Sequence, residues 1–165
     1  AMKTICATPI TVENFKEYGS FTDLLKPEHP FYAPGQPQFY PDRELLRLGD
    51  TSVGISVCLE TKKERKVIEF AEFHHHTGEG ILCLDDDILF YCAPATETAE
   101  VPFEHLKAFL VPKGTFVCLK PGVWHGCQFP VSKETAHILI VLPERTYAKD
   151  CVCILFEDTD KIEIR

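Results

Sequence analysis

The chain has no long apolar run, no C-x-x-C cysteine pair and no extended basic segment. Its longest uninterrupted apolar run is ILIVL at residues 138–142, far short of the ~20 residues that a membrane-spanning helix needs. No basic segment followed by an apolar one opens the chain, so we expect a cytoplasmic protein with no membrane partner. The formal net charge is −8, and the longest basic run is KKERK at residues 62–66, which argues against nucleic-acid binding.

The eight cysteines do not suggest a disulfide framework or a zinc site. Most of them lie inside apolar runs such as GILCL, LFYCA and FVCL. Because a free cysteine behaves as a small hydrophobic residue, we expect reduced and buried thiols. Cys151 and Cys153 in CVCILF are two residues apart, so a strand would place both on one face.

At 165 residues the chain fits one domain that is large enough to bury a core. Residues 11–19 (TVENFKEYG) predict a helix, with Thr11 as its N-cap and Gly19 in the position of a C-cap glycine. Residues 26–42 contain five prolines and predict an irregular loop that can wrap the domain or cover a pocket. We therefore expect residues 1–50 to form a helix and a wrapping loop.

From residue 52 onward, short β-prone runs alternate with turn residues. No helical pattern separates these runs, which favours a sandwich or barrel over a parallel α/β sheet. The sequence therefore predicts a small all-β barrel over residues 51–165. The predicted strands are 52–59, 66–74, 80–85, 88–92, 106–111, 115–119, 123–128, 136–142 and 151–156.

The stretch EFHHHTGEG at residues 72–80 places three histidines between two glutamates. Alternate residues of a strand share a face, so Ile68, Phe70, Glu72 and His74 should point the same way. The apolar start of this face indicates the barrel interior. The turn TGEG then allows Glu79 to approach the same end of the barrel.

A second group, GTFVCLKPGVWHG at residues 114–126, ends with His125. Antiparallel neighbours could bring His125 opposite the first group, although each of these polar residues could instead be a satisfied barrel-mouth or turn residue. Two imidazoles with carboxylates suit Mn, Fe, Ni, Co or Zn. The sequence therefore predicts a metal site formed by His74, His125 and the carboxylates Glu72 and Glu79.

The two groups resemble the motifs of the cupin superfamily, whose fold is an antiparallel double-stranded β-helix or jelly roll. The first cupin motif is H-x-H followed by a glutamate, and Glu72, His74 and Glu79 stand at these positions. The second is G, five residues, P-x-G-x-x-H. It is matched by Gly114, Gly122 and His125, with lysine in place of proline.

Among the cupins, the chain is most similar to the ureidoglycolate lyases, also called ureidoglycolate hydrolases. The segments PITVENFKEYG, EFH, LKAFLVPKG and GVWHG carry this resemblance in order along the chain. It implies a cytosolic and often dimeric enzyme that releases urea from ureidoglycolate and leaves glyoxylate. We therefore expect a homodimer with a small-molecule substrate.

The resemblance implies a catalytic base, Glu72 or His74, beside a metal held by His74, Glu79 and His125. One departure concerns the family's strand arginine, whose position is near Cys58 here. Lys120 or a metal would then have to supply the positive charge for a carboxylate substrate, and Trp124 is either a core residue or a platform for that substrate. A metal-dependent sugar-directed cupin resembling an isomerase or epimerase, or a cupin that only binds a small metabolite, remains an alternative.

Overall fold

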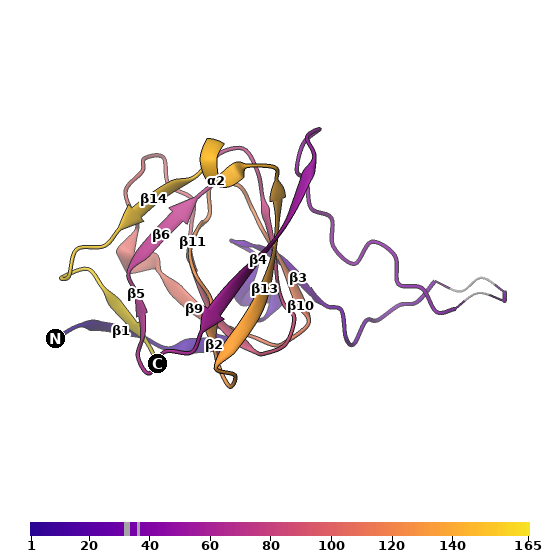
Figure 1. Cartoon of the computed structure of the whole chain (residues 1–165), viewed down its shortest axis with the longest axis horizontal. Coiled ribbons are helices and arrows are strands. Elements are labelled where there is room, and N and C mark those ends of the chain that lie inside the picture. The colour runs from indigo at the N-terminus through magenta and orange to yellow at the C-terminus, as the bar shows by residue number, and fades with distance from the viewer. Residues whose placement is uncertain (32–33, 36) are drawn as a thin grey trace.

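The computed structural model describes residues 1–31, 34–35 and 37–165 and consists mainly of short strands (Figure 1). The strands are β1 (Lys3–Ile5), β2 (Ala7–Pro9), β3 (Gly19–Asp23), β4 (Val53–Thr61), β5 (Lys66–Ile68), β6 (Phe70–Phe73), β7 (Glu79–Cys83), β8 (Ile88–Ala93), β9 (Lys107–Val111), β10 (Thr115–Leu119), β11 (Trp124–His125), β12 (Phe129–Pro130), β13 (Thr135–Pro143), β14 (Val152–Leu155) and β15 (Ile162–Ile164). The helices are α1 (Val12–Phe15), the 3-10 turn η1 (Phe103–His105) and α2 (Thr146–Lys149).

Within the described residues, the strands form three sheets. One sheet has the order β3-β10-β7-β13-β4, and a larger one has the order β14-β6-β11-β8-β9-β2 with β12 also paired to β8. A third, small sheet has the order β1-β15-β5. Except for the parallel pairs β1–β15 and β2–β9, the neighbouring strands are antiparallel. The all-β jelly roll is thus confirmed, with its two larger sheets not closed into one hydrogen-bonded barrel.

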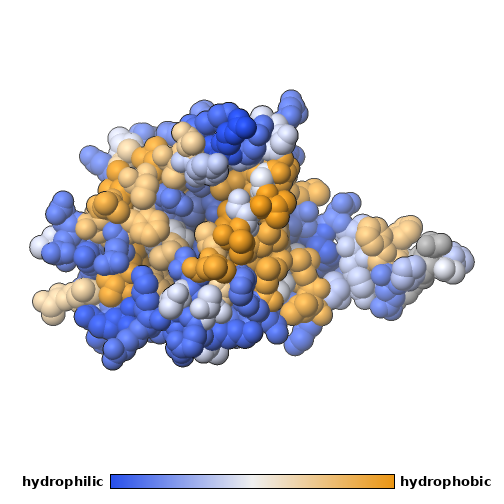
Figure 2. Space-filling view, in the orientation of Figure 1, coloured by the Kyte–Doolittle hydropathy of each residue, from blue (hydrophilic) through white to orange (hydrophobic). Residues whose placement is uncertain are grey.

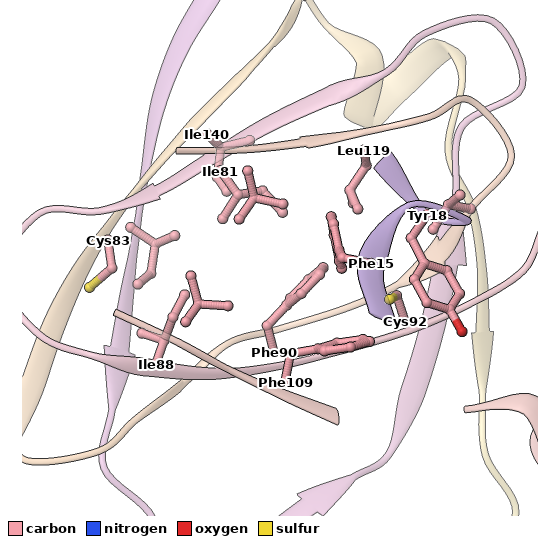
Figure 3. Packing of buried hydrophobic residues seen from close by; sticks show 14 of the residues in the cluster. Phe15, Tyr18, Ile81, Cys83, Ile88, Phe90, Cys92, Phe109, Leu119 and Ile140 are labelled. Carbon is pink, nitrogen blue, oxygen red and sulfur yellow. The ribbon is translucent and has the colours of Figure 1, made fainter. Parts of the chain in front are cut away.

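Two apolar cores lie on the opposite faces of the larger sheet. Along β8, Ile88, Phe90 and Cys92 belong to a core shared with the five-stranded sheet (Figure 3). Tyr91 and Ala93 belong to a second core, which includes Ile162 of the small sheet. Because both faces of β8 are covered, its sequence ILFYCA is apolar without alternation.

The strand predicted over residues 66–74 is divided at Glu69. Residues 66–68 pair with β15, whereas residues 70–73 pair with β11 and β14. The break shifts the alternation, so Ile68 joins Ala71 and Phe73 in the second core. The prediction that Ile68 shares a face with Phe70 is therefore wrong.

The N-terminal helix is shorter than predicted. Thr11 is its N-cap: the hydroxyl oxygen of Thr11 accepts from the backbone N–H of Asn14, and the Asn14 side chain accepts in return. The helix ends with Lys16 as its C-cap, and Gly19 instead begins β3. A Cβ at Gly19 would lie 1.8 Å from the carbonyl oxygen of Cys118, so this glycine permits a close strand contact.

Residues 1–50 contribute more than a helix and a loop, because β1, β2 and β3 each join a different sheet. The described part of the proline-rich segment extends away from the sheets instead of wrapping them (Figure 1). Where the chain comes back from this segment to the sheets, the guanidinium of Arg43 donates to the carbonyl oxygen of Glu28 and to the hydroxyl of Thr22. Among the described residues, no helix has the length and apolar character that a membrane span requires.

Candidate active site

A pocket of about 310 Å³ opens between the two larger sheets. Strand β4 contributes Ser56, Cys58 and Glu60 to its wall, and β13 contributes Ile140 and Leu142. The facing wall comes from β6 and the residue after it, through Phe70, Glu72 and His74. The predicted inward face of residues 70–74 therefore lines a pocket.

Two buried histidines approach each other beside this pocket. His74 follows β6, and His125 ends β11, directly opposite Glu72 in the antiparallel register. The Nδ1–H of His74 donates to the carbonyl oxygen of Asp150 at 2.7 Å, and the Nδ1–H of His125 donates to that of Val123 at 2.9 Å. With both Nδ1 atoms occupied, both Nε2 atoms point into the site.

The two Nε2 atoms converge on one carboxylate oxygen. Oε2 of Glu79 lies 2.9 Å from Nε2 of His74 and 2.7 Å from Nε2 of His125. A neutral imidazole would turn a lone pair toward the ionised carboxylate, so each contact needs either a hydrogen on one of its two atoms or a metal ion among the three groups. The structure thus brings together the three predicted metal ligands.

Electrostatics in this group favour charged side chains. Burial alone would raise the pKa of Glu79, but the charges and hydrogen bonds of His125 and His74 lower it to about 2. Burial alone would lower the pKa of His125, but the charge and hydrogen bond of Glu79 raise it to about 9. Glu79 and His125 therefore form a buried ion pair when no metal binds.

Glu72 is the more accessible carboxylate of the site. Its Oε1 lies 3.9 Å from Nε2 of His125, and its Oε2 accepts from the thiol of Cys151 at 3.3 Å. One ligand atom from each of Glu72, His74 and His125 lies within 4.8 Å of the others. These donors fit a divalent transition metal, because each imidazole is oriented by a carbonyl at Nδ1 and the donors are nitrogen and oxygen.

Comparison with known proteins identifies the family of the chain. The family model for ureidoglycolate lyase matches residues 2–163. The chain belongs to the ureidoglycolate lyase family. No curated protein matches it.

Among the solved structures that resemble the chain is "Crystal Structure of Fe(II)-HppE with alternative substrate (S)-1-HPP", with 16% identity and a TM-score of 0.39. That match covers 71% of this chain and 65% of the other. RmlC from Streptococcus suis in complex with dTDP-D-xylose is 12% identical, with a TM-score of 0.34, and the match covers 59% of this chain and 49% of RmlC. The chain thus spans less than two thirds of either protein.

Two residues that the sequence predicts to bind substrate do not line the pocket of this member of the ureidoglycolate lyase family. The ammonium of Lys120 donates to the carbonyl oxygen of Lys16 near α1, and Lys120 does not line the pocket. Trp124 is fully buried in the second core, where its ring packs against Phe73 and its indole N–H donates to Thr96. We therefore assign neither residue to substrate binding.

The pocket is acidic. Its described lining includes Glu60, Glu72 and Glu79 but neither lysine nor arginine. Cys58 occupies the wall where the family arginine was expected, and its thiol is uncharged because burial and the nearby carboxylates raise its pKa. A free carboxylate would therefore meet negative charge here unless a cation is also bound.

Several residues of the site are not evident from sequence patterns. Cys151, Tyr147 and Gln128 line the pocket, and Asp150 contacts the histidine turn from 76 residues away. The spacing of Cys151 and Cys153 indicated a shared strand face, and β14 does pair with β6, but β14 begins after Cys151. All eight cysteines are free, and only Cys83, Cys92 and Cys118 are fully buried, so the expectation of buried thiols holds for part of the set.

Proposed function

We propose that this protein cleaves the carbon–nitrogen bond of ureidoglycolate, releasing urea and leaving glyoxylate, or that it acts on a related small hydroxy or oxo acid. The observation that carries the proposal is the convergence of His74, Glu79 and His125 beside Glu72, at the pocket of a chain that belongs to the ureidoglycolate lyase family. No oxidant or second substrate is needed, because the reaction breaks one C–N bond and turns the carbinol into a carbonyl.

The reaction needs a base for the carbinol hydroxyl and an acid for the departing nitrogen. Glu72 is suited to be the base, because it faces the pocket and its second oxygen is held by Cys151. Glu60 is suited to be the acid, because it lines the same pocket and burial raises its pKa. Two carboxylates in different environments can thus have opposite roles.

His74, His125 and Glu79 would hold a divalent metal, with Glu72 close enough to be a further ligand. Such an ion would supply Lewis acidity and the positive charge that the pocket lining lacks. The residues themselves fix the geometry, since the Asp150 and Val123 carbonyls hold each imidazole with Nε2 toward the centre.

The acidic lining supports a second candidate. With Glu60, Glu72 and Glu79 present and neither lysine nor arginine in the described lining, the pocket would accept a neutral hydroxylated ligand more readily than a free acid. A sugar-directed isomerase or epimerase, or a module that only binds such a metabolite, is consistent with this charge.

The assay that tests the proposal measures urea and glyoxylate from ureidoglycolate, using protein reconstituted separately with Mn, Fe, Ni, Co and Zn. We expect equal amounts of both products and a loss of at least a hundredfold in kcat for Glu72→Gln, in line with removal of a general base. Absence of glyoxylate with every metal, together with binding of neutral sugars, would favour the second candidate.

We also infer that a second copy of the chain covers the outer face of the five-stranded sheet. Val53, Ile55, Val57 and Leu59 alternate along β4 and are 50–70% exposed. Figure 2 shows apolar residues gathered in this region. Because exposed apolar patches mark interaction sites and these four residues carry no charge, a two-fold contact between identical faces fits this surface.

A further inference from the structure

Asp150 contacts all three residues of the histidine turn. Its carbonyl oxygen accepts from Nδ1–H of His74 at 2.7 Å. Its carboxylate accepts from the backbone N–H groups of His75 and His76, each at 2.8 Å and each through a different oxygen. One residue thus fixes both the backbone of the turn and the ring of its first histidine.

We propose that Asp150 is a positioning residue of the metal-binding centre. Its carboxylate holds the backbone at His75 and His76, and this brings its own carbonyl oxygen to Nδ1 of His74. The hydrogen at Nδ1 leaves Nε2 of His74 as the nitrogen available to a metal. The inference rests on the proposed function only in taking the histidine pair as a metal-binding centre.

The segment around Asp150 is itself well anchored. Helix α2 begins with the buried Thr146, whose hydroxyl donates to the carbonyl oxygen of Pro143 at 2.8 Å. Asp150 is the C-cap of this helix, and its N–H donates back to the carbonyl oxygen of Thr146 at 2.9 Å. The turn of α2 therefore sets where the Asp150 carboxylate and carbonyl can reach.

The next residue supports the same assignment. The Cys151 thiol donates to Glu72, so the consecutive residues Asp150 and Cys151 contact two different side chains of the centre. Neither Asp150 nor Cys151 belongs to the group of ligand atoms formed by Glu72, His74 and His125. We therefore assign this segment a supporting role, with Asp150 as its principal contact.

Asp150→Asn is the most informative substitution, because it keeps the size and the backbone carbonyl. The amide can accept from only one of the two N–H groups, and its NH₂ would face the other as a second donor. The turn should then shift, and the contact from His74 to the carbonyl should weaken. Metal affinity should fall about 10- to 100-fold, as is usual when a residue that orients a ligand is lost.

Asp86→Asn provides a matched control. One carboxylate oxygen of Asp86 accepts from the consecutive backbone N–H groups of Ser132 and Lys133, each at 2.9 Å, and the other oxygen accepts from the backbone N–H of Asp87 at 2.9 Å. Asp86 is buried and does not line the pocket. The amide NH₂ of this variant must face an N–H on one side, so it should also lose stability, while its metal affinity stays within about twofold of wild type.

The experiment titrates Zn²⁺ into metal-free wild type and both variants by calorimetry and follows the Nδ1–H proton of His74 by NMR. We expect Asp150→Asn alone to weaken Zn²⁺ binding and to make this proton exchange rapidly with water. Unchanged affinity and exchange in Asp150→Asn, with lowered stability, would overturn the proposal in favour of a purely structural role. If wild type binds no Zn²⁺, the proposed metal centre fails, whereas the exchange of the His74 proton still decides whether Asp150 positions that ring.

Discussion

The space between the two larger sheets has an apolar end and a polar end, built partly from the same strands. On β7, Ile81 and Cys83 lie in the apolar core, while Glu79 at the start of the strand lies at the histidine pair. All three residues share one face of β7 because they are two positions apart. The two ends thus differ because a glutamate stands at the start of β7, although its side chain is on the same face of the strand as the apolar residues.

The two ends are stabilised by different interactions. The apolar end is stabilised by burial and close packing. The rings of Phe15 and Phe109, for example, pack edge to face with their centroids 5.3 Å apart (Figure 3). The polar end contains buried charges, which are costly unless they are paired. Each buried group there has a partner, so its integrity depends on mutual hydrogen bonds.

The largest expected effect is on stability at the apolar end. Phe90→Ala removes a fully buried ring and should lower the free energy of unfolding by about 3–5 kcal/mol, as measured by urea denaturation. Folded Phe90→Ala protein should retain wild-type metal affinity, because Phe90 belongs to the apolar core and not to the group of candidate ligands. A large loss of metal affinity in folded protein would show that the two ends are not separable.

At the polar end, His74→Ala and His125→Ala should each abolish most metal binding while the protein remains folded. Removing a ligand should exceed the ~10–100-fold loss that follows removal of a supporting residue. Metal analysis after dialysis, with circular dichroism as the folding control, measures both quantities. Wild-type metal content in both variants would remove the ligand assignment and favour direct acid–base roles.

The polar end should also make stability depend on pH in metal-free protein. The pKa of Glu79 is lowered from 4.5 to about 2, so its contribution is complete above pH 4.5 and is lost as pH falls toward 2. The pKa of His125 is raised from 6.5 to about 9, so its contribution is complete below pH 6.5 and is lost as pH rises toward 9. Stability from this pair is therefore greatest between about pH 4.5 and 6.5.

Thermal unfolding of metal-free protein between pH 6.5 and 9 provides the measurement. Wild type should lose Tm over this range, and His125→Gln should lose less because it has no proton to release. If Tm falls with pH equally steeply in the two proteins, the ion pair between Glu79 and His125 is contradicted.

The smallest effect on folding is expected on the outer face of the five-stranded sheet. Val57→Asp changes an exposed residue, so unfolding of the isolated chain should change by only about 0.5 kcal/mol. If a second copy covers this face, light scattering should show a dimer for wild type and a monomer for Val57→Asp. A wild-type monomer at high concentration would exclude this contact.

Much of the fold could be predicted from the sequence because alternation and turns are local signals. The strands after residue 52 and the inward direction of Glu72 and His74 follow from such patterns. The three-residue strands β1 and β15 could not be predicted, since each depends on a partner far along the chain. The break at Glu69 was also missed, because β-propensity continues through it while the chain moves to another sheet.

The candidate site was partly predictable for the same reason. Motif spacing identified His74, Glu79 and His125, and the structure places them in contact. Spacing gave no direction for Lys120, whose side chain turns toward α1. The role of Asp150 had no local signal, because a helical turn 76 residues away delivers it to the histidines.

Calorimetric titration of Zn²⁺ into metal-free protein at pH 7.5, in two buffers of different ionisation enthalpy, tests the central claim most directly. Because the pKa of His125 is about 9, metal binding must displace its proton, and we predict one bound ion with at least one proton released per ion. The same titration of His125→Ala should show much weaker binding. Absence of binding to wild type, or binding without proton release, would contradict a metal centre built on His74, Glu79 and His125.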